Sequence, residues 1–329
     1  MAYQRTLDRR PMWAVGIALV ALAGSLAVVT QGSAAATPPT CFGQVTTITG
    51  SGSITGTPGN DVIVGSTGAD AIDGQGGNDL ICGLEGNDAL QGGPGNDKVD
   101  GGPGGDFING DVLSFDPIDL NCVGGDDRLL GGPGTDFIAG DCTVETNDPT
   151  AGHVSGTGGA DTIFGGGTTD FIAGDHNGNY VTATGGNDTI DGGRGGDFVN
   201  GDSVADDLVS GASGDDLIAG SEGRDYLTGD AGVFACDAQI TSDAGDDVIS
   251  GGPDDDGPII GDDNPVCGIP SGTSGNDSLS GNDGNDELHG DSYTDTGNPV
   301  FDSGDGSDGC DGGAGTDTAA LCEFVTNVP

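Results

Sequence analysis

The chain has 329 residues, of which 69 are glycine, and its 54 acidic residues against 7 lysines and arginines give a formal net charge of −47. A surface this acidic repels nucleic acid and anionic membranes, so we expect neither as a partner and favour cations instead. The composition alone also suits an acidic, glycine-rich disordered chain, so an ordered fold has to be argued from a pattern in the sequence.

The amino terminus has the pattern of a secretory signal peptide. Arg9 and Arg10 precede an apolar run over residues 12–29, and a small-residue stretch ends at Ala36. A basic region, an apolar core and an A-x-A cleavage site predict the removal of residues 1–36. Because the apolar run is slightly long, an uncleaved membrane anchor is the alternative. We expect a secreted mature chain that does not insert into a membrane.

Residues 56–109 contain six consecutive nonapeptides, and residues 37–55 before them are expected to cap the array. The units read GTPGNDVIV, GSTGADAID, GQGGNDLIC, GLEGNDALQ, GGPGNDKVD and GGPGGDFIN. Positions one and four are glycine, position six is aspartate, and position eight is aliphatic. A disordered chain has no reason to keep these residue types in phase.

Each nonapeptide predicts a six-residue turn followed by a three-residue strand. Gly, Asn, Asp and Pro favour the turn, and the aliphatic residue gives the strand one inward side chain. Two units close one flattened coil of eighteen residues, and stacked coils form two parallel sheets with a thin aliphatic seam. The turn of each unit then lies over the turn two units later, so Asp61, Asp79 and Asp97 would form a column.

A column of bare carboxylates repels itself, and the chain offers few cations of its own. The turns supply backbone carbonyl groups and one carboxylate each, which are the ligands that Ca²⁺ takes in sets of roughly 6–8. We therefore expect multiple Ca²⁺ ions that bridge neighbouring coils. One aliphatic residue in nine cannot offset the backbone entropy of folding, so metal binding and folding should be coupled.

The units resemble the G-G-x-G-x-D-x-U-x nonapeptide of RTX, or haemolysin-type, calcium-binding proteins. This resemblance implies an all-β fold, a parallel β-roll or β-solenoid, and calcium as the ligand. Toxins and proteases of this kind use an uncleaved C-terminal export signal, whereas this chain resembles the small secreted proteins built only of such repeats. The resemblance covers residues 56–320 and does not specify a biological role.

Residues 110–320 continue the pattern as pairs of units, each pair followed by an excursion of 9 to 16 residues, and residues 321–329 are expected to cap the end. In all twenty units position six is aspartate and position eight is apolar, with Cys310 and Ala319 the weakest apolar residues. These aspartates are the predicted calcium ligands: Asp61, Asp70, Asp79, Asp88, Asp97, Asp106, Asp127, Asp136, Asp161, Asp170, Asp188, Asp197, Asp216, Asp225, Asp247, Asp256, Asp277, Asp286, Asp308 and Asp317.

The excursions open with Gly-Asp, as at Gly110-Asp111 and Gly140-Asp141. Because a pair of units is one full coil, all excursions should leave as loops from one edge of the solenoid, here called the loop edge. The excursion over residues 174–182 could instead be a decayed unit, which would shift the phase. The opposite, smooth edge should hold the more regular ion column, at Asp136, Asp170, Asp197, Asp225, Asp256, Asp286 and Asp317.

Eight cysteines in a secreted chain favour disulfides over metal-binding thiols, because no C-x-x-C motif occurs. The spacing does not fix the connectivity. The pairs we favour are Cys310–Cys322, which flank the last repeat, then Cys122–Cys142, Cys236–Cys267 and Cys41–Cys82.

Aromatic residues recur at position seven of five second units, and a proline interrupts a later one. Phe107, Phe137, Phe171, Phe198 and Tyr226 could form a ligand-binding stripe, although we favour a role in covering a sheet face. Pro258 and one extra residue should break strand pairing at 251–260.

Signals of catalysis are poor. No G-x-S-x-G, H-E-x-x-H, EF-hand, P-loop or dinucleotide motif occurs, and no acid pair is singled out. We predict a calcium-binding protein that is not an enzyme, with a structural or binding role outside the cell. The alternatives are an adhesin or carbohydrate-binding scaffold that uses the excursions, and an enzyme on the same scaffold.

Overall fold

A computed structural model describes residues 38–114, 120–144, 153–233, 239–240, 243–265, 273–291 and 306–328. All regular elements in these ranges are β-strands. The described ranges contain no helix that is long and apolar enough to cross a bilayer. Residues 1–36 and the pair Cys236–Cys267 lie outside the described residues.

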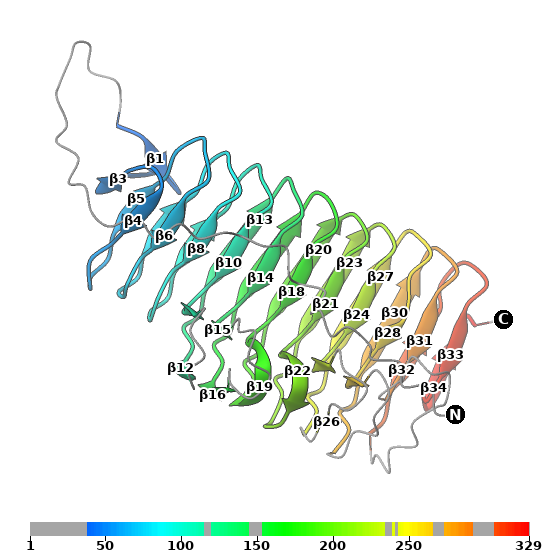
Figure 1. The fold of residues 1–329 in the computed structure, drawn as a ribbon. Coiled ribbons are helices and arrows are strands. Elements are labelled where there is room, and N and C mark those ends of the chain that lie inside the picture. Colours follow the sequence, from blue (N-terminus) through cyan, green and yellow to red (C-terminus); the bar gives the residue numbers. More distant parts are fainter. Residues whose placement is uncertain are drawn as a thin grey trace, which may run out of the picture. The chain divides into compact units, whose positions relative to one another are not determined.

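Two long parallel sheets form the solenoid (Figure 1), which confirms the predicted all-β architecture. The second-unit sheet consists of β4 (Ser53–Thr55), β6 (Ala71–Asp73), β8 (Ala89–Gln91), β10 (Phe107–Asn109), β14 (Phe137–Ala139), β18 (Phe171–Ala173), β21 (Phe198–Asn200), β24 (Tyr226–Thr228), β28 (Ile259–Ile260), β31 (Glu287–His289) and β33 (Thr318–Ala320). The first-unit sheet consists of β3 (Ile48–Thr49), β5 (Val62–Val64), β7 (Leu80–Cys82), β9 (Lys98–Asp100), β13 (Arg128–Gly132), β17 (Thr162–Gly166), β20 (Thr189–Arg194), β23 (Leu217–Glu222), β27 (Val248–Gly252), β30 (Ser278–Asn282), β32 (Gly309–Asp311) and β34 (Phe324–Thr326).

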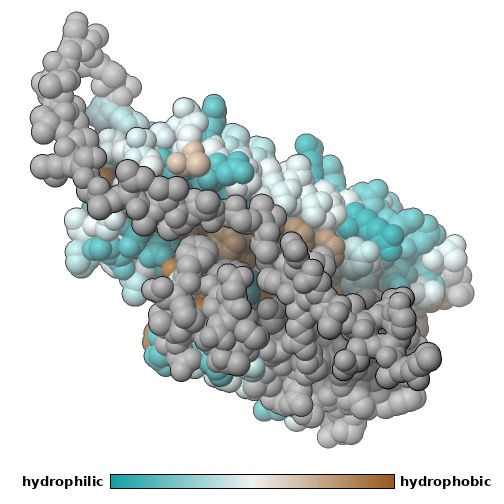
Figure 2. Space-filling view, viewed as in Figure 1, coloured by the Kyte–Doolittle hydropathy of each residue, from teal (hydrophilic) through white to brown (hydrophobic). Residues whose placement is uncertain are grey.

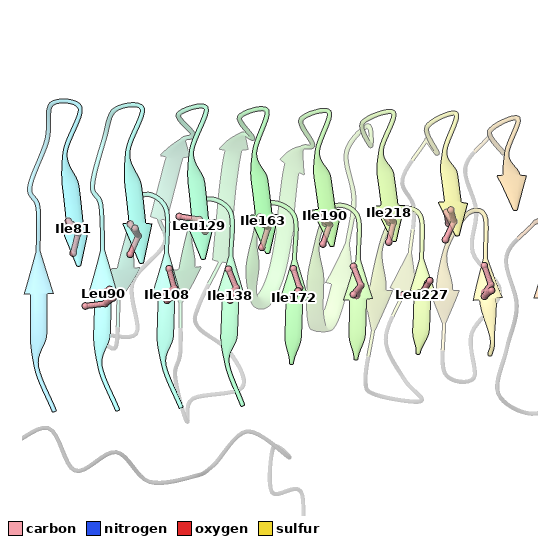
Figure 3. Packing of buried hydrophobic residues seen from close by; sticks show 14 of the residues in the cluster. Ile81, Leu90, Ile108, Leu129, Ile138, Ile163, Ile172, Ile190, Ile218 and Leu227 are labelled. Carbon is pink, nitrogen blue, oxygen red and sulfur yellow. The ribbon is translucent and has the colours of Figure 1, made fainter. Parts of the chain in front are cut away.

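Position eight of each repeat supplies the core between these sheets. Ile63 pairs with Ile81 and Ile81 with Val99, so each strand lies beside the strand two units later. Figure 3 shows the two rows of inward side chains, including Leu90 and Ile108, and all five of these residues are completely buried. The core is therefore one residue wide per strand, and Figure 2 shows that much of the coloured surface is hydrophilic.

The excursions contain a third parallel sheet, which the sequence analysis did not anticipate. This insert sheet runs alongside the loop edge and has its own buried cluster, which includes Val144, Val154 and Val181. The prediction of plain loops is therefore wrong in these segments. The strands are β11 (Leu113–Ser114), β15 (Thr143–Val144), β19 (Asn177–Thr184), β22 (Val204–Val209), β25 (Gly232–Val233) and β29 (Asn264–Pro265), with β12 (Leu120–Val123), β16 (His153–Thr157) and β26 (Gln239–Ile240) pairing beside them.

All excursions leave from the same edge, as predicted. Each one follows a strand of the second-unit sheet and returns into a strand of the first-unit sheet. The segment 174–182 contributes to β19 in the insert sheet, while β20 keeps its register with β17. This excursion is therefore an insertion, and the phase of the repeats does not shift.

The first coil starts earlier than the first recognisable nonapeptide. Ile48 pairs with Ile63 and Ile54 with Ile72, so β3 and β4 extend both sheets by one rung. The antiparallel pair β1 (Thr40–Cys41) and β2 (Gln44–Val45) precedes them. Three of the favoured disulfides are present: Cys41–Cys82, Cys122–Cys142 and Cys310–Cys322.

Strand pairing at Pro258 is shortened but not broken. Ile259 pairs with Leu227 on one side and with Leu288 on the other, and its side chain is fully buried. The peptide bond between Gly257 and Pro258 is cis. The extra residue moves the core position from Pro258 to Ile259, so the expectation of a broken sheet is wrong.

The position-seven aromatic residues form a stack on the outer face of the second-unit sheet. Ring centroids of Phe137 and Phe171 lie 4.9 Å apart at an interplanar angle of 4°, and those of Phe198 and Tyr226 4.9 Å apart at 5°. Parallel rings at the spacing of neighbouring strands cover one another's faces. The geometry supports the covering role and disfavours a platform on which a sugar ring would stack.

We expect Phe171→Ala to destabilise the calcium-loaded protein by about 1–3 kcal/mol, because it removes two stacked ring pairs worth roughly 0.5–1.5 kcal/mol each. The thermal midpoint at saturating calcium measures this effect. Val248→Ala is the control, since Val248 is also at position seven but is 49% exposed, and it should change stability by about 0.5 kcal/mol or less. Equal midpoints for the two variants would contradict a stabilising role of the stack.

Candidate metal centre

The position-six aspartates form two columns, one along each edge of the solenoid. The backbone N–H of Asp61 donates to Oδ1 of Asp79 at 2.7 Å, and that of Asp79 donates to Oδ1 of Asp97 at 2.6 Å. The loop-edge column continues in the same way through Asp127, Asp161, Asp188, Asp216, Asp247, Asp277 and Asp308. The smooth-edge column runs through Asp70, Asp88, Asp106, Asp136, Asp170, Asp197, Asp225, Asp256, Asp286 and Asp317.

The second carboxylate oxygen of these aspartates is buried without a hydrogen-bond partner. This holds for Oδ2 of eighteen of the twenty residues, all except Asp61 and Asp70 at the start of the columns. In those two, Oδ2 accepts hydrogen bonds from Thr57 and Ser66. An ionised oxygen removed from water without a partner is costly, so each turn requires a positive charge or a proton.

The position-one glycines leave open the space that these oxygens face. A Cβ atom on Gly131 would lie 2.5 Å from Oδ2 of Asp136 and 2.5 Å from the carbonyl oxygen of Gly165, the corresponding glycine of the next coil. Near the C-terminal end, a Cβ on Gly312 would lie 2.8 Å from Oδ2 of Asp317. Carboxylate and carbonyl oxygens therefore gather around a space without side chains, and this donor set fits Ca²⁺.

Burial raises the pKa of these carboxyl groups. On the smooth edge desolvation raises the pKa of Asp136 and Asp197 to about 6 and that of Asp170 to about 8. On the loop edge it raises the pKa of Asp127 to about 9 and that of Asp277 to about 10, and neighbouring carboxylates add to both shifts. Protons and metal ions should therefore compete for the same oxygens near neutral pH.

Comparison with known proteins agrees with this geometry. A family model of the RTX calcium-binding nonapeptide repeat matches more than half of the chain, at residues 55–90, 83–112, 124–141, 151–175, 177–208, 204–233, 239–257 and 271–296. The chain belongs to the RTX calcium-binding repeat family. No curated protein matches the sequence.

The RTX turns of the loop edge carry more negative charge than those of the smooth edge. Both columns have the same ladder of backbone-to-carboxylate hydrogen bonds, and the more regular ion column expected at the smooth edge stays a prediction. The difference is an additional buried aspartate in six of the interrupted RTX turns, such as Asp141 and Asp175. The sequence analysis recorded these residues only as the starts of excursions.

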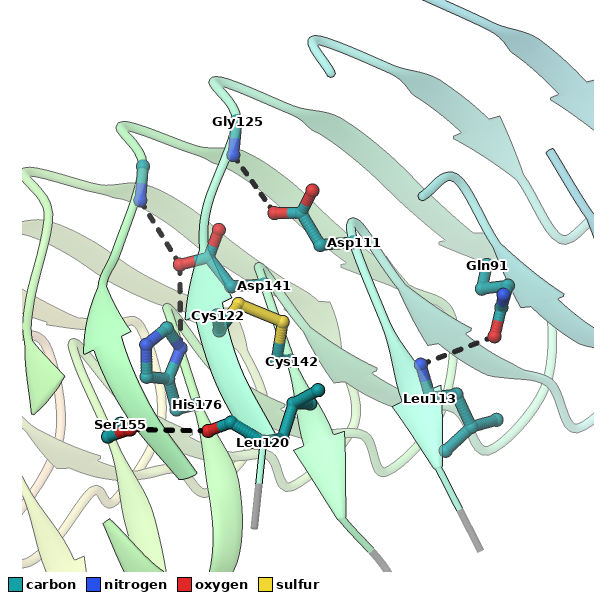
Figure 4. The surroundings of a disulfide bond; sticks show 11 residues. Gln91, Asp111, Leu113, Leu120, Cys122, Gly125, Asp141, Cys142, Ser155 and His176 are labelled. Carbon is teal, nitrogen blue, oxygen red and sulfur yellow. Dashed lines mark hydrogen bonds and ion pairs between the residues drawn. A yellow bond between two sulfur atoms is a disulfide. The ribbon is translucent and has the colours of Figure 1, made fainter. Parts of the chain in front are cut away.

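Three groups of potential ligands occur at this edge among the described residues. Asp161, Asp175 and Asp188 each place one carboxylate oxygen within 4.8 Å of the others. Asp141, Asp175 and His176 form a second group, with Nδ1 of His176 3.5 Å from Oδ2 of Asp141 (Figure 4). The third group combines Asp111 with Cys122 and Cys142, but these cysteines form a disulfide and offer no thiolate. Carboxylates therefore dominate the donor set.

His176 was not predicted as part of any site. Its side chain is completely buried, and this burial lowers the pKa of its imidazole. Only its position directly after the Gly-Asp pair, where the other excursions have Val112, Cys142, Ser203, Ala231, Asp263 and Ser292, could have drawn attention to it.

Proposed function

We propose that this chain is a secreted calcium-binding protein that folds around several Ca²⁺ ions and has a structural or binding role outside the cell. The observation that carries the proposal is the set of eighteen buried Oδ2 atoms without a partner, aligned in two columns. The twenty position-six aspartates would supply the carboxylate ligands, and the position-one glycines would supply carbonyl oxygens.

The proposed role is binding rather than catalysis. The buried acidic groups repeat along the whole solenoid at equivalent positions, which suits the same ligand bound many times. Family membership supports calcium as that ligand. An extracellular module of this kind would bind with Kd values of about 10⁻⁴–10⁻³ M, so it would fill outside the cell and remain empty in the cytoplasm.

Calorimetric titration of residues 37–329 with calcium tests the proposal directly. We expect several ions per chain, with heat of folding accompanying binding. Magnesium is the control, because its small octahedral shell does not match a wide cradle of carbonyl and carboxylate oxygens, so it should neither bind in the same number nor compete effectively. A chain that binds one calcium ion or none would contradict the proposal.

Secretion is tested separately. The intact mass of the protein recovered from the culture medium should correspond to a chain that starts at residue 37, as the A-x-A pattern predicts. Recovery of the full-length chain in the membrane fraction would instead support the uncleaved anchor.

A further inference from the structure

The inserts enter the repeat within a turn, between positions two and four. Gly92 of the uninterrupted block donates its N–H to Asn109, and Gly110 donates to Ala139 in the same manner one coil later. Gly110 therefore occupies position one, and Asp111 position two, of a unit that resumes at Gly125 after the insert. The remaining position-one glycines of this column are Gly140, Gly174, Gly201, Gly229, Gly261 and Gly290.

We call these interrupted turns of the loop edge split turns. Position two of a split turn is always aspartate. Asp111, Asp141, Asp175, Asp202, Asp230 and Asp262 are at most 2% exposed, and successive members are joined by backbone hydrogen bonds. In the uninterrupted block the corresponding residue is Thr57, Gln75 or Gly93, so the carboxylate accompanies the insertion.

The position-two carboxylates hold the returning chain, with one oxygen in Asp111, Asp141, Asp230 and Asp262 and with both oxygens in Asp175 and Asp202. Asp111 accepts the N–H of Gly125 at 2.9 Å, and Asp230 accepts that of Gly245 at 2.9 Å. This contact closes the split turn across its opening. A neutral acceptor would perform this role without the cost of a buried charge, so the contact does not explain why aspartate is used.

In the four aspartates that use one oxygen for this contact, the other oxygen points to a ligand. Oδ1 of Asp111, Oδ1 of Asp141, Oδ2 of Asp230 and Oδ2 of Asp262 are buried and have no hydrogen-bond partner. At the central rung, Asp175 lies with Asp161 and Asp188, whose own Oδ2 atoms are also without partners, and the three potential ligand atoms are within 4.8 Å of one another. A smooth-edge turn has no equivalent of Asp175.

We propose that the split turns bind divalent cations with an additional carboxylate from position two, and so form a tighter class of calcium sites than the smooth-edge turns. This inference rests on the proposed function. Affinity for Ca²⁺ rises with the number of charged ligands around it. Because the same aspartates hold the returning chain, filling of these sites would also fix the insert sheet against the solenoid.

The test variant is D141N/D230N/D262N. Asparagine keeps a carbonyl oxygen for the glycine N–H but removes the negative charge. The matched control is D126N/D215N/D246N, which changes the net charge equally at exposed position-five residues of the returning units. Circular dichroism at saturating calcium establishes that each protein is folded, and the single variant D230N is used if the triple variant is not.

Calorimetry with calcium should show two classes of sites in the unaltered protein, separated by at least about tenfold in Kd. The test variant should weaken the tight class by at least about tenfold, and D230N should weaken part of it, whereas the control should stay within about threefold. If the test variant titrates like the control, the position-two carboxylates only close the turn and the inference is overturned. If the unaltered protein binds no calcium, the proposed function itself fails.

Discussion

Removal of calcium at pH 8 is expected to abolish the strand structure of this protein, and acidification of the metal-free chain to pH 5 should restore part of it. The reason is that the carboxyl columns need either a metal ion or a proton. Without either, the buried negative charges repel one another, and the narrow aliphatic seam is too small to compensate for the conformational entropy of the chain.

The direction of the pH effect follows from the raised pKa values. Burial raises the pKa of Asp79 to about 6 and those of Asp97, Asp106 and Asp256 to about 7, above the ordinary value of 3.8. At a pH between the ordinary pKa and the raised pKa values, these carboxyl groups hold protons in the folded state that they have released in the unfolded state. Stability of the metal-free fold is therefore fully present below about pH 4 and is lost as the pH rises through 6 to 7, by about 1.4 kcal/mol per pH unit and proton.

Calcium should reverse this dependence, because its binding requires deprotonated carboxylates. Its affinity should fall as the pH decreases from 8 to 5. Far-UV circular dichroism with chelator and with calcium, at both pH values, measures the two effects, and pH 5 remains above the sequence pI of about 4.1. A chain that keeps its full strand signal in chelator at pH 8, or that loses signal on acidification, would contradict the account.

The nine-residue period of the sequence determines the solenoid because it fixes the spacing of the turn aspartates and of the core aliphatic residues together. An aspartate at position six and an aliphatic residue at position eight can stay in phase only if each turn lies over a turn and each strand over a strand. This predicted the stacking of Asp61, Asp79 and Asp97, the parallel pairing of Ile63 with Ile81, and the single edge from which the inserts leave.

The insert sheet could not be found by the same reasoning, because its strands have no fixed period. β16 and β19 pair from His153 with Tyr180 to Thr157 with Thr184, although the inserts differ in length. The split turns were missed because the insert separates Gly110-Asp111 from Gly125 in the sequence, although the fold brings these residues together in one turn. Only the backbone hydrogen bonds show that Gly110 continues the column of Gly92.

Replacement of a position-one glycine in the middle of the solenoid should have the largest effect of any single substitution. In Gly174→Ala the new methyl group would clash with the carbonyl oxygen of Gly201 and with Oδ2 of Asp188. Both are ligand candidates at the same turn, so the coil must shift and the cation space is filled. Because each coil is stabilised mainly by its neighbours, the damage divides the array into two parts.

We expect Gly174→Ala to cost about 3 kcal/mol or more at saturating calcium, at the upper end of what overpacking causes. Gly68→Ala is the matched control: it is also a repeat glycine, but at position four, and its new methyl group would meet only Oγ of Ser66 at 4.0 Å. Thermal unfolding and calcium titration of the two variants distinguish an effect of the filled cation space from an effect of lost backbone flexibility. A cost from lost backbone flexibility alone would be similar at both positions, whereas a filled cation space affects Gly174→Ala alone and lowers the number of bound ions as well as the stability.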